Sequence, residues 1–156
     1  LDKSEFLTNF WEIYFEKSKW ISEKVFDLKP YDSLESFTSK ILEVYENSNK
    51  ETILKILNLH PELAIEKKLT SNSESEQTKA NLKECTPKEF NEFKKLNFDY
   101  KKKFNFPFII AVKGKKKTEI LNIFKERINN SLEKEFLEAK NQVKKIAMFR
   151  LEEIIK

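Results

Sequence analysis

The sequence has little of the residues that break regular structure or build crosslinks. Its 156 residues include one glycine, four prolines, one cysteine and one histidine. Few glycines and prolines favour long helices with short turns over sheets, so we expect an all-α protein. The single cysteine, Cys85, cannot form an internal disulfide or a cysteine metal cluster, which predicts a reducing, cytoplasmic location.

Long apolar runs are also missing, and no stretch qualifies as a signal peptide or a membrane span, so we expect no membrane association. Basic residues outnumber acidic ones by 30 to 26, and the net charge of +4 is spread along the chain. This balance suits an anionic ligand but does not predict nucleic-acid binding. The length and the lack of linkers predict one domain over residues 1–156.

Apolar residues recur at helical spacing along most of the chain. Capping signals mark several helix starts, among them Asp32 with Glu35, Asn49, and Thr86 followed by Pro87. Together they predict a multi-helix bundle, with helices over about the following ranges: 4–14, 20–28, 32–44, 49–57, 61–69, 73–85, 86–104, 118–129 and 132–156.

The only histidine, His60, stands directly before Pro61. A residue before proline is pushed out of the helical region, and proline suits the first turn of a helix. We therefore expect His60 at the entry of a helix that runs from Pro61 to about residue 69. Histidine titrates near neutral pH, so His60 is the best candidate in the chain for moving protons. The alternative is a structural histidine that packs or caps at a turn.

A second candidate region is the polar stretch Ser73-Glu74-Ser75-Glu76-Gln77, which leads into a predicted helix. Ser73 and Glu76 have the spacing of a capping box, in which the serine hydroxyl binds a backbone N–H and the glutamate reaches back. The same helix start can present Glu76 and Gln77 beside unpaired backbone donors, where a polar or anionic small molecule would bind. The spacing favours neither interpretation.

The one stretch with strand-like character is residues 106–112, a continuous apolar run too short for a buried helix. An extended segment in a helical protein leaves backbone N–H and C=O groups that need partners. A planar ligand with amide-like edges could supply them, and so could neighbouring side chains around a buried connector. Lysines follow, and we expect them to form a solvated face or to steer an anionic substrate inward: Lys113, Lys115, Lys116 and Lys117.

Arg150 lies on the apolar face of the last predicted helix, in line with Ala139, Val143 and Ile146. A guanidinium that faces a core needs a partner, and a bidentate carboxylate suits its geometry best. The alternative is that Arg150 bends to the edge of this face and forms a weak pair with Glu153, three residues on.

Seven short motifs carry a family resemblance through their order and approximate spacing. They are Glu16-x-Ser18-x-Trp20, Leu59-His60-Pro61-Glu62-Leu63-Ala64, Ser73-x-x-Glu76-Gln77, Leu96-Asn97-x-x-Tyr100, Lys103-Phe104-Asn105-Phe106-Pro107-Phe108-Ile109, Arg127-Ile128-x-Asn130 and Lys145-Ile146-Ala147-x-x-Arg150-Leu151. In these motifs, over nearly its whole length, the chain resembles the OHCU decarboxylase family. That family acts on 2-oxo-4-hydroxy-4-carboxy-5-ureidoimidazoline (OHCU), an intermediate of urate breakdown.

The chain departs from the usual family pattern at four positions. Lys19 replaces a usual proline, and Lys79, Asn81 and Asn105 stand where the family usually has glycine. Asparagine tolerates the left-handed backbone conformation for which glycine is used. We therefore expect the site to be retained, with room for altered efficiency.

The resemblance implies an all-helical fold, a homodimer, and a decarboxylation without cofactor or metal that releases CO2 and yields (S)-allantoin. Matched residue by residue, His60 is the acid/base histidine of the family, Glu76 the pocket carboxylate and Arg150 the arginine of the last helix. The substrate-binding positions that it implies are Pro61, Ser73, Glu74, Ser75, Glu76, Gln77, Phe108, Ile109, Ile110, Ala111 and Val112.

A mechanism follows as a hypothesis. The ring system of the substrate can take the electron pair that CO2 leaves behind, so neither a metal nor pyridoxal phosphate is required. Arg150 would anchor an anionic or carbonyl group, while Glu76 and Gln77 fix the ureido and hydroxyl groups. The backbone of residues 108–112 would read amide edges, and His60 would protonate one face of the carbanion. The rival interpretations are a helical protein-interaction module, a basic nucleic-acid binder, and a diverged family member with a related small anionic substrate.

Overall fold

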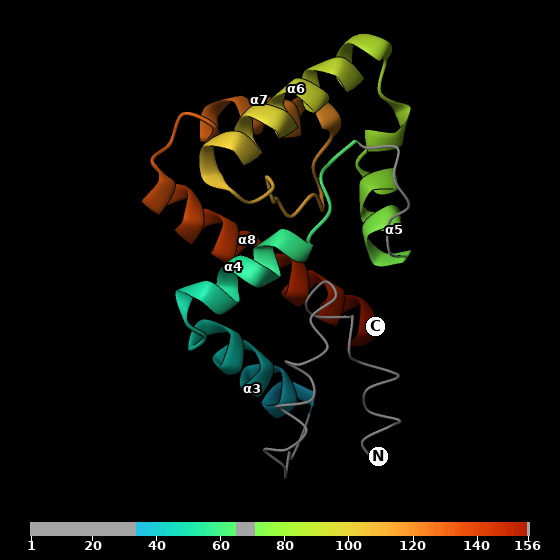
Figure 1. The fold of residues 1–156 in the computed structure, drawn as a ribbon. Helices are drawn as coiled ribbons and strands as arrows, with labels where there is room; N and C mark the ends of the chain where they lie inside the picture. Colours follow the sequence, from blue (N-terminus) through green and yellow to red (C-terminus); the bar gives the residue numbers. More distant parts are fainter. Residues whose placement is uncertain (1–33, 65–70, 156) are drawn as a thin grey trace. The chain divides into compact units, whose positions relative to one another are not determined.

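The computed structural model describes residues 34–64 and 71–155. Within these ranges the chain forms helices and no strand, which confirms the prediction of an all-α fold (Figure 1). The elements are α3 (Leu34–Glu46), α4 (Lys50–Leu59), α5 (Ser71–Lys79), the 3-10 helix η1 (Leu82–Glu84), α6 (Pro87–Phe104), α7 (Lys117–Arg127) and α8 (Leu132–Ile155). The helices predicted over 4–14 and 20–28 lie outside the described residues.

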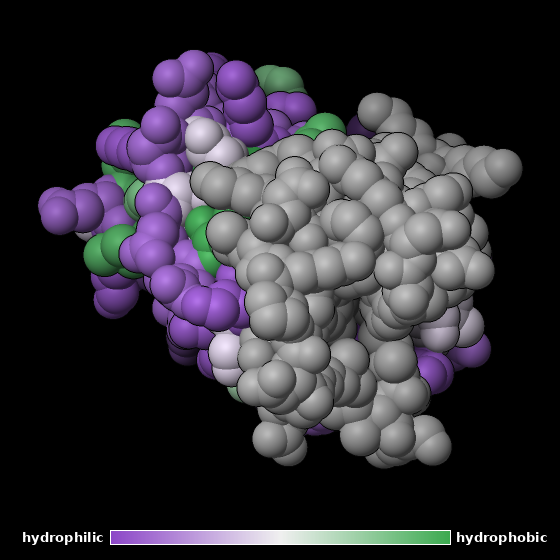
Figure 2. Space-filling model, turned by 90° about the horizontal axis from the view of Figure 1, so that it is seen from below, coloured by the Kyte–Doolittle hydropathy of each residue, from purple (hydrophilic) through white to green (hydrophobic). Residues whose placement is uncertain are grey.

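None of the described helices is long and apolar enough to cross a membrane. On the face shown in Figure 2, the described surface is mostly hydrophilic, with hydrophobic residues scattered between the polar ones. Such scattered apolar residues are normal on a protein surface.

The chain divides into two compact units. One is drawn from Leu1–Leu59 and Lys144–Lys156, and it contains α3, α4 and the C-terminal part of α8. Its buried side chains include Ile41, Tyr45, Ile53, Ile56, Leu57, Ile146 and Ala147. The other unit is His60–Val143, and it contains α5, η1, α6, α7 and the first part of α8.

An aromatic cluster forms the core of the second unit. The ring of Tyr100 contacts those of Phe104, Phe106, Phe108 and Phe124 at centroid distances of 4.5, 5.9, 5.4 and 5.7 Å. Phe108 and Phe124 are stacked at 3.8 Å, with 8° between their planes. The cluster joins α6, α7 and the segment 106–112, and it places the buried aromatic residues of α6 in the core of this unit.

Helix α6 begins as its sequence predicts. Pro87 is its first residue, Thr86 Oγ1 accepts from Glu89 N–H at 3.2 Å, and Glu89 Oε1 accepts from Thr86 N–H at 3.0 Å. The hydrogen bond from Thr86 N–H, together with one from Lys117, holds the pKa of the Glu89 carboxyl below its usual value. The predicted cap of α6 is confirmed.

Replacing this cap should have a measurable cost. We expect Thr86→Ala to lower the free energy of unfolding by about 1 kcal/mol, because one backbone N–H at the helix start loses its acceptor. Thr118→Ala is the matched control, since Thr118 is an exposed threonine in the first turn of α7. Urea unfolding of both variants checks the prediction, and equal stabilities would contradict it.

Two predicted helix boundaries are wrong. Ser73 is already the third residue of α5, which begins at Ser71, so Ser73 and Glu76 do not form a capping box at the helix start. The helix also ends at Lys79 rather than near Cys85, because Asn81 adopts a left-handed conformation with φ 64°. A residue in that conformation cannot continue a right-handed helix.

The expectation for the two asparagines at family glycine positions is confirmed. Asn81 and Asn105 both have a φ of 64°, and Asn105 is the C-terminal cap of α6. The backbone conformation for which glycine is suited is therefore reached here without glycine.

Candidate active site

His60 follows the last residue of α4 and is 7% exposed. The helix predicted to start at Pro61 is wrong for the described residues, because Pro61 and Glu62 are irregular and Leu63 and Ala64 form a bend. Ala64 has a φ of 52°, a left-handed conformation that is costly for a residue with a Cβ. His60 therefore directly follows the end of α4. Because the next residues are not helical, their backbone groups need hydrogen-bond partners from elsewhere in the chain.

Two buried amide side chains hold this segment. Gln77 Oε1 accepts from the N–H of Ala64 at 3.1 Å, and Gln77 Nε2 donates to the C=O of Glu62 at 3.2 Å. Asn97 Nδ2 donates to the C=O of Leu63 at 3.0 Å. Gln77 and Asn97 thus form hydrogen bonds with backbone groups of three consecutive residues. Those groups are not free for helical hydrogen bonds, which explains why the chain forms no helix here.

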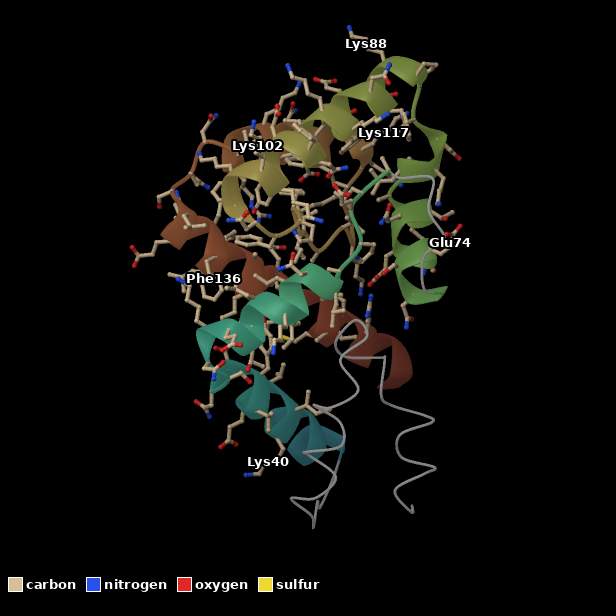
Figure 3. The ribbon with its side chains drawn as sticks, in the orientation of Figure 1. Lys40, Glu74, Lys88, Lys102, Lys117 and Phe136 are labelled. Atoms are coloured by element: carbon tan, nitrogen blue, oxygen red, sulfur yellow. The ribbon has the colours of Figure 1, made fainter. Side chains whose placement is uncertain are left out.

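Helix α5 presents its binding candidates on different sides. Ser73 and Gln77, one turn apart, are 5% and 3% exposed, and Glu76 beside them is half-buried. Since Gln77 binds residues 62 and 64, this buried face of α5 lies against the segment that follows His60. Glu74 (labelled in Figure 3) and Ser75 are exposed instead, and Glu74 pairs with Lys83 at 3.4 Å.

The segment 106–112 is buried throughout and contains no helix, as predicted. Neighbouring side chains satisfy part of its backbone. Arg127 Nη1 donates to the C=O of Ile109 at 2.7 Å, and Gln142 Oε1 accepts from the N–H of Ala111 at 2.9 Å. Both interpretations of this segment remain open for its other peptide groups. Sequence reasoning missed the two side chains that hold it.

Arg127 belongs to a buried polar cluster. Its Nε and Nη2 donate to Glu135 Oε2 at 3.1 and 2.9 Å, while Asn130 Nδ2 donates to Glu135 Oε1 at 2.9 Å. The Tyr100 hydroxyl also donates to Glu135. Burial, reinforced by this hydrogen bond, raises the pKa of Tyr100 far above its ordinary value, so the phenol remains a donor. Arg127 Nε also lies 3.2 Å from Glu135 Oε1, so each oxygen of the buried carboxylate is bound more than once.

A signal for this pair was present in the sequence. Arg127 follows Ile120 and Phe124 at helical spacing, and Glu135 precedes Ala139 at the same spacing. Opposite charges on the apolar faces of two helices joined by a short loop indicate a buried ion pair, because neither charge is tolerated there alone.

Arg150 lies on the buried face of α8 and is 6% exposed, as predicted. It falls in the unit drawn from residues 1–59 and 144–156, whereas His60 and Glu76 fall in the unit His60–Val143. The convergence of these three side chains in one site stays a prediction.

The lysines after residue 112 are not simply a solvated face. Lys117 Nζ binds Glu89 Oε1 and the C=O of Glu84, both at 3.1 Å, and Lys116 Nζ donates to the C=O of Lys79 at 3.2 Å (Lys117 is labelled in Figure 3). These two lysines therefore tie the start of α7 to η1, the start of α6 and the end of α5.

Within the described ranges, no group of three or more histidine, cysteine, aspartate or glutamate side chains could hold a metal ion.

Comparison with known proteins gives one consistent result. The family model for OHCU decarboxylase matches residues 1–152. A uric acid degradation bifunctional protein of a Bacillus species is 43% identical over 142 residues, which cover 91% of this chain and 28% of that protein. The 2-oxo-4-hydroxy-4-carboxy-5-ureidoimidazoline decarboxylase of Halalkalicoccus jeotgali is 33% identical over 153 residues, covering 98% of this chain and 86% of the relative.

A solved structure agrees with the sequence relatives. A crystal structure of OHCU decarboxylase in the presence of (S)-allantoin superimposes with a TM-score of 0.75 and 26% identity, covering 92% of this chain and 95% of that one. The chain spans only 28% of the length of the bifunctional relatives in two Bacillus species. The family model and the full-length relative nevertheless extend over almost all of this chain, which belongs to the OHCU decarboxylase family.

Proposed function

We propose that this chain decarboxylates 2-oxo-4-hydroxy-4-carboxy-5-ureidoimidazoline to (S)-allantoin in urate degradation, without a metal or an organic cofactor. Membership of the family supports the reaction class. The observation that carries the proposal is the single buried histidine in a backbone segment that Gln77 and Asn97 fix through three hydrogen bonds. A proton carrier at a fixed position is what a decarboxylase with a self-activating substrate needs from its protein.

In this proposal His60 delivers a proton to one face of the carbanion that remains when CO2 leaves. The electron pair of the broken C–C bond is delocalised into the ring system of the substrate until that proton arrives. Delivery from one side alone sets the handedness of the product. Glu76 and Arg150 complete the machinery, with Arg150 anchoring an anionic or carbonyl group.

The binding residues in the proposal come from three segments. Gln77 can brace the backbone and bind substrate together, because an amide has two N–H donors and two acceptor lone pairs, and its bonds to Glu62 and Ala64 use one of each. The full set of binding positions is Pro61, Ser73, Glu74, Ser75, Glu76, Gln77, Phe108, Ile109, Ile110, Ala111 and Val112.

A homodimer and a cytoplasmic location belong to the same proposal. The single cysteine, Cys85, is free, and burial raises the pKa of its thiol. Such a thiol is compatible with a reducing compartment. Sedimentation of the purified chain tests the dimer.

The proposed reaction can be tested directly. The unstable substrate is generated in place from urate with urate oxidase and hydroxyisourate hydrolase, and the optical signal of (S)-allantoin is followed with and without this protein. We expect the protein to accelerate the appearance of that signal over the spontaneous reaction. A rate equal to the spontaneous one would show that the assignment is wrong.

The lysines after the buried segment should matter little for this rate. We expect double replacement of Lys115 and Lys116 by alanine to change the rate by no more than about threefold, because charges near a protein surface mainly affect encounter. The same coupled assay, run at low and physiological ionic strength, measures the effect. A loss of activity with unchanged stability would show that these lysines take part in binding, because Lys116 also binds the C=O of Lys79.

A further inference from the structure

The two side chains that hold the segment 106–112 bind the same edge of it. Residues 107–112 contain no helix, turn or bend. Arg127 donates a hydrogen bond to the C=O of Ile109, and Gln142 accepts one from the N–H of Ala111. In extended chain the peptide groups of residues i and i+2 point to the same side, and those of residue i+1 point to the other. Arg127 and Gln142 therefore occupy the edge of residues 109 and 111.

The opposite edge belongs to residues 108, 110 and 112. The C=O of Val112 closes a turn by accepting from Lys115 N–H at 2.9 Å. Among the hydrogen bonds of the described residues, none engages the N–H or the C=O of Ile110. The same is true of Phe108, but only Ile110 lies between the two residues that Arg127 and Gln142 bind. A buried peptide group normally has a partner, so the Ile110 pair is suited to a ligand.

Arg127, which binds the Ile109 carbonyl, is itself held by several contacts. Arg127 is bound by Glu135, which also accepts from Tyr100 and Asn130. The Arg127 guanidinium lies over the Phe108 ring at 4.4 Å from its centroid. Because the carboxylate is anchored from several sides, it restrains the guanidinium that binds the Ile109 carbonyl.

Gln142, which binds the N–H of Ala111, is also held by a second hydrogen bond. Gln142 Nε2 donates to Glu138 Oε1 at 2.8 Å, one turn earlier on α8, and this bond orients the amide so that its oxygen faces Ala111. Arg127 belongs to α7 and Gln142 to α8, and both side chains bind the backbone of the segment. They fix its rotation about its own axis, which decides where the Ile110 peptide groups point.

We propose that Arg127 and Gln142 are positioning residues that turn the N–H and C=O of Ile110 toward the amide-like edge of the substrate. The inference rests on the proposed function and narrows the binding role of residues 108–112 to one donor and acceptor pair. A cyclic ureide edge, with an N–H beside a C=O, is the chemical partner that such a pair recognises.

The test uses Gln142→Met, which keeps the size of the side chain and removes the acceptor for Ala111. We expect KM for the substrate to rise about tenfold while kcat stays within about threefold, since a misdirected binding edge weakens recognition rather than proton transfer. Asn141→Met is the matched control, because Asn141 is the exposed neighbour on the same helix. A purely structural role would lower the melting temperature and leave KM unchanged, and that result would overturn the inference.

A swapped variant tests whether the hydrogen bond itself is responsible. Glu138→Gln with Gln142→Glu exchanges the two groups, so that a glutamate oxygen again faces Ala111 and an amide again donates between the two positions. We expect KM to return to within about threefold of wild type, because both hydrogen bonds can form again. Failure of the swap to restore KM would contradict the assigned role of Gln142.

A further measurement separates this inference from the proposed function. Amide hydrogen exchange in the ligand-free protein reports the order of residues 108–112 directly. We expect faster exchange at Ala111 in Gln142→Met and wild-type exchange in the swap. If wild type does not accelerate the reaction, the proposed function fails. If exchange is unchanged in Gln142→Met, the positioning role fails, whatever the activity.

Discussion

His60→Asn is expected to slow the decarboxylation by about 10²- to 10⁴-fold, the range that a general acid or base contributes. Asparagine is smaller but polar, and it retains hydrogen-bonding atoms near the position of Nδ1, but it cannot carry a proton at neutral pH. The segment that follows is held by hydrogen bonds to the backbone of Glu62, Leu63 and Ala64. The variant should therefore keep the fold and lose the chemistry.

The measurement is the rate of (S)-allantoin formation in the coupled assay, together with the optical purity of the product. Purity is informative because the residual reaction should approach the spontaneous one, in which water protonates either face. Asn58→Ala is the matched control, since Asn58 is an exposed residue near the end of α4. A His60→Asn rate within about threefold of wild type would exclude His60 as the proton carrier.

The start of α6 shows how far local sequence reasoning reaches. Thr86, Pro87 and Glu89 lie next to one another, and their interactions need no partner from elsewhere in the chain, so the cap could be predicted from spacing. The C-terminal cap Asn105 was predictable for the same reason, because its left-handed conformation is a local preference.

The segment after His60 shows where that reasoning ends. Proline at position 61 favours a helix start locally. Gln77 and Asn97, 13 and 34 residues beyond the backbone groups that they bind, hold the chain in another conformation. Spacing within a short window contains no information on such partners.

The candidate site divides in the same way. His60 and the α5 residues could be proposed from their types and positions, and the burial of His60, Ser73 and Gln77 agrees with a role inside the protein. Their supports could not be identified, because a support is defined by a contact across the fold. Arg127 reaches a carbonyl 18 residues away, and Gln142 a peptide N–H 31 residues away.

The largest stability effect is expected at the buried ion pair of the second unit. Arg127→Met should lower the free energy of unfolding by about 3 to 5 kcal/mol, because it leaves the Glu135 carboxylate buried without its countercharge. The side chains of Arg127 and Glu135 are 8% and 0% exposed, so water cannot replace the guanidinium. Denaturant unfolding at constant pH measures the loss.

Removing the whole group of charges should be less harmful than removing one of them. The triple variant Tyr100→Phe, Arg127→Met and Glu135→Leu leaves neither a buried charge nor a buried hydroxyl, and we expect it to be more stable than Arg127→Met by about 2 kcal/mol or more. Lys125→Met is the control on the same helix, because the pair of Lys125 with Glu92 is largely exposed and should contribute less than about 1 kcal/mol. If the triple variant is no more stable than Arg127→Met, the loss comes from packing against Phe108 and the hydrogen bond to the Ile109 carbonyl, and not from the unpaired carboxylate.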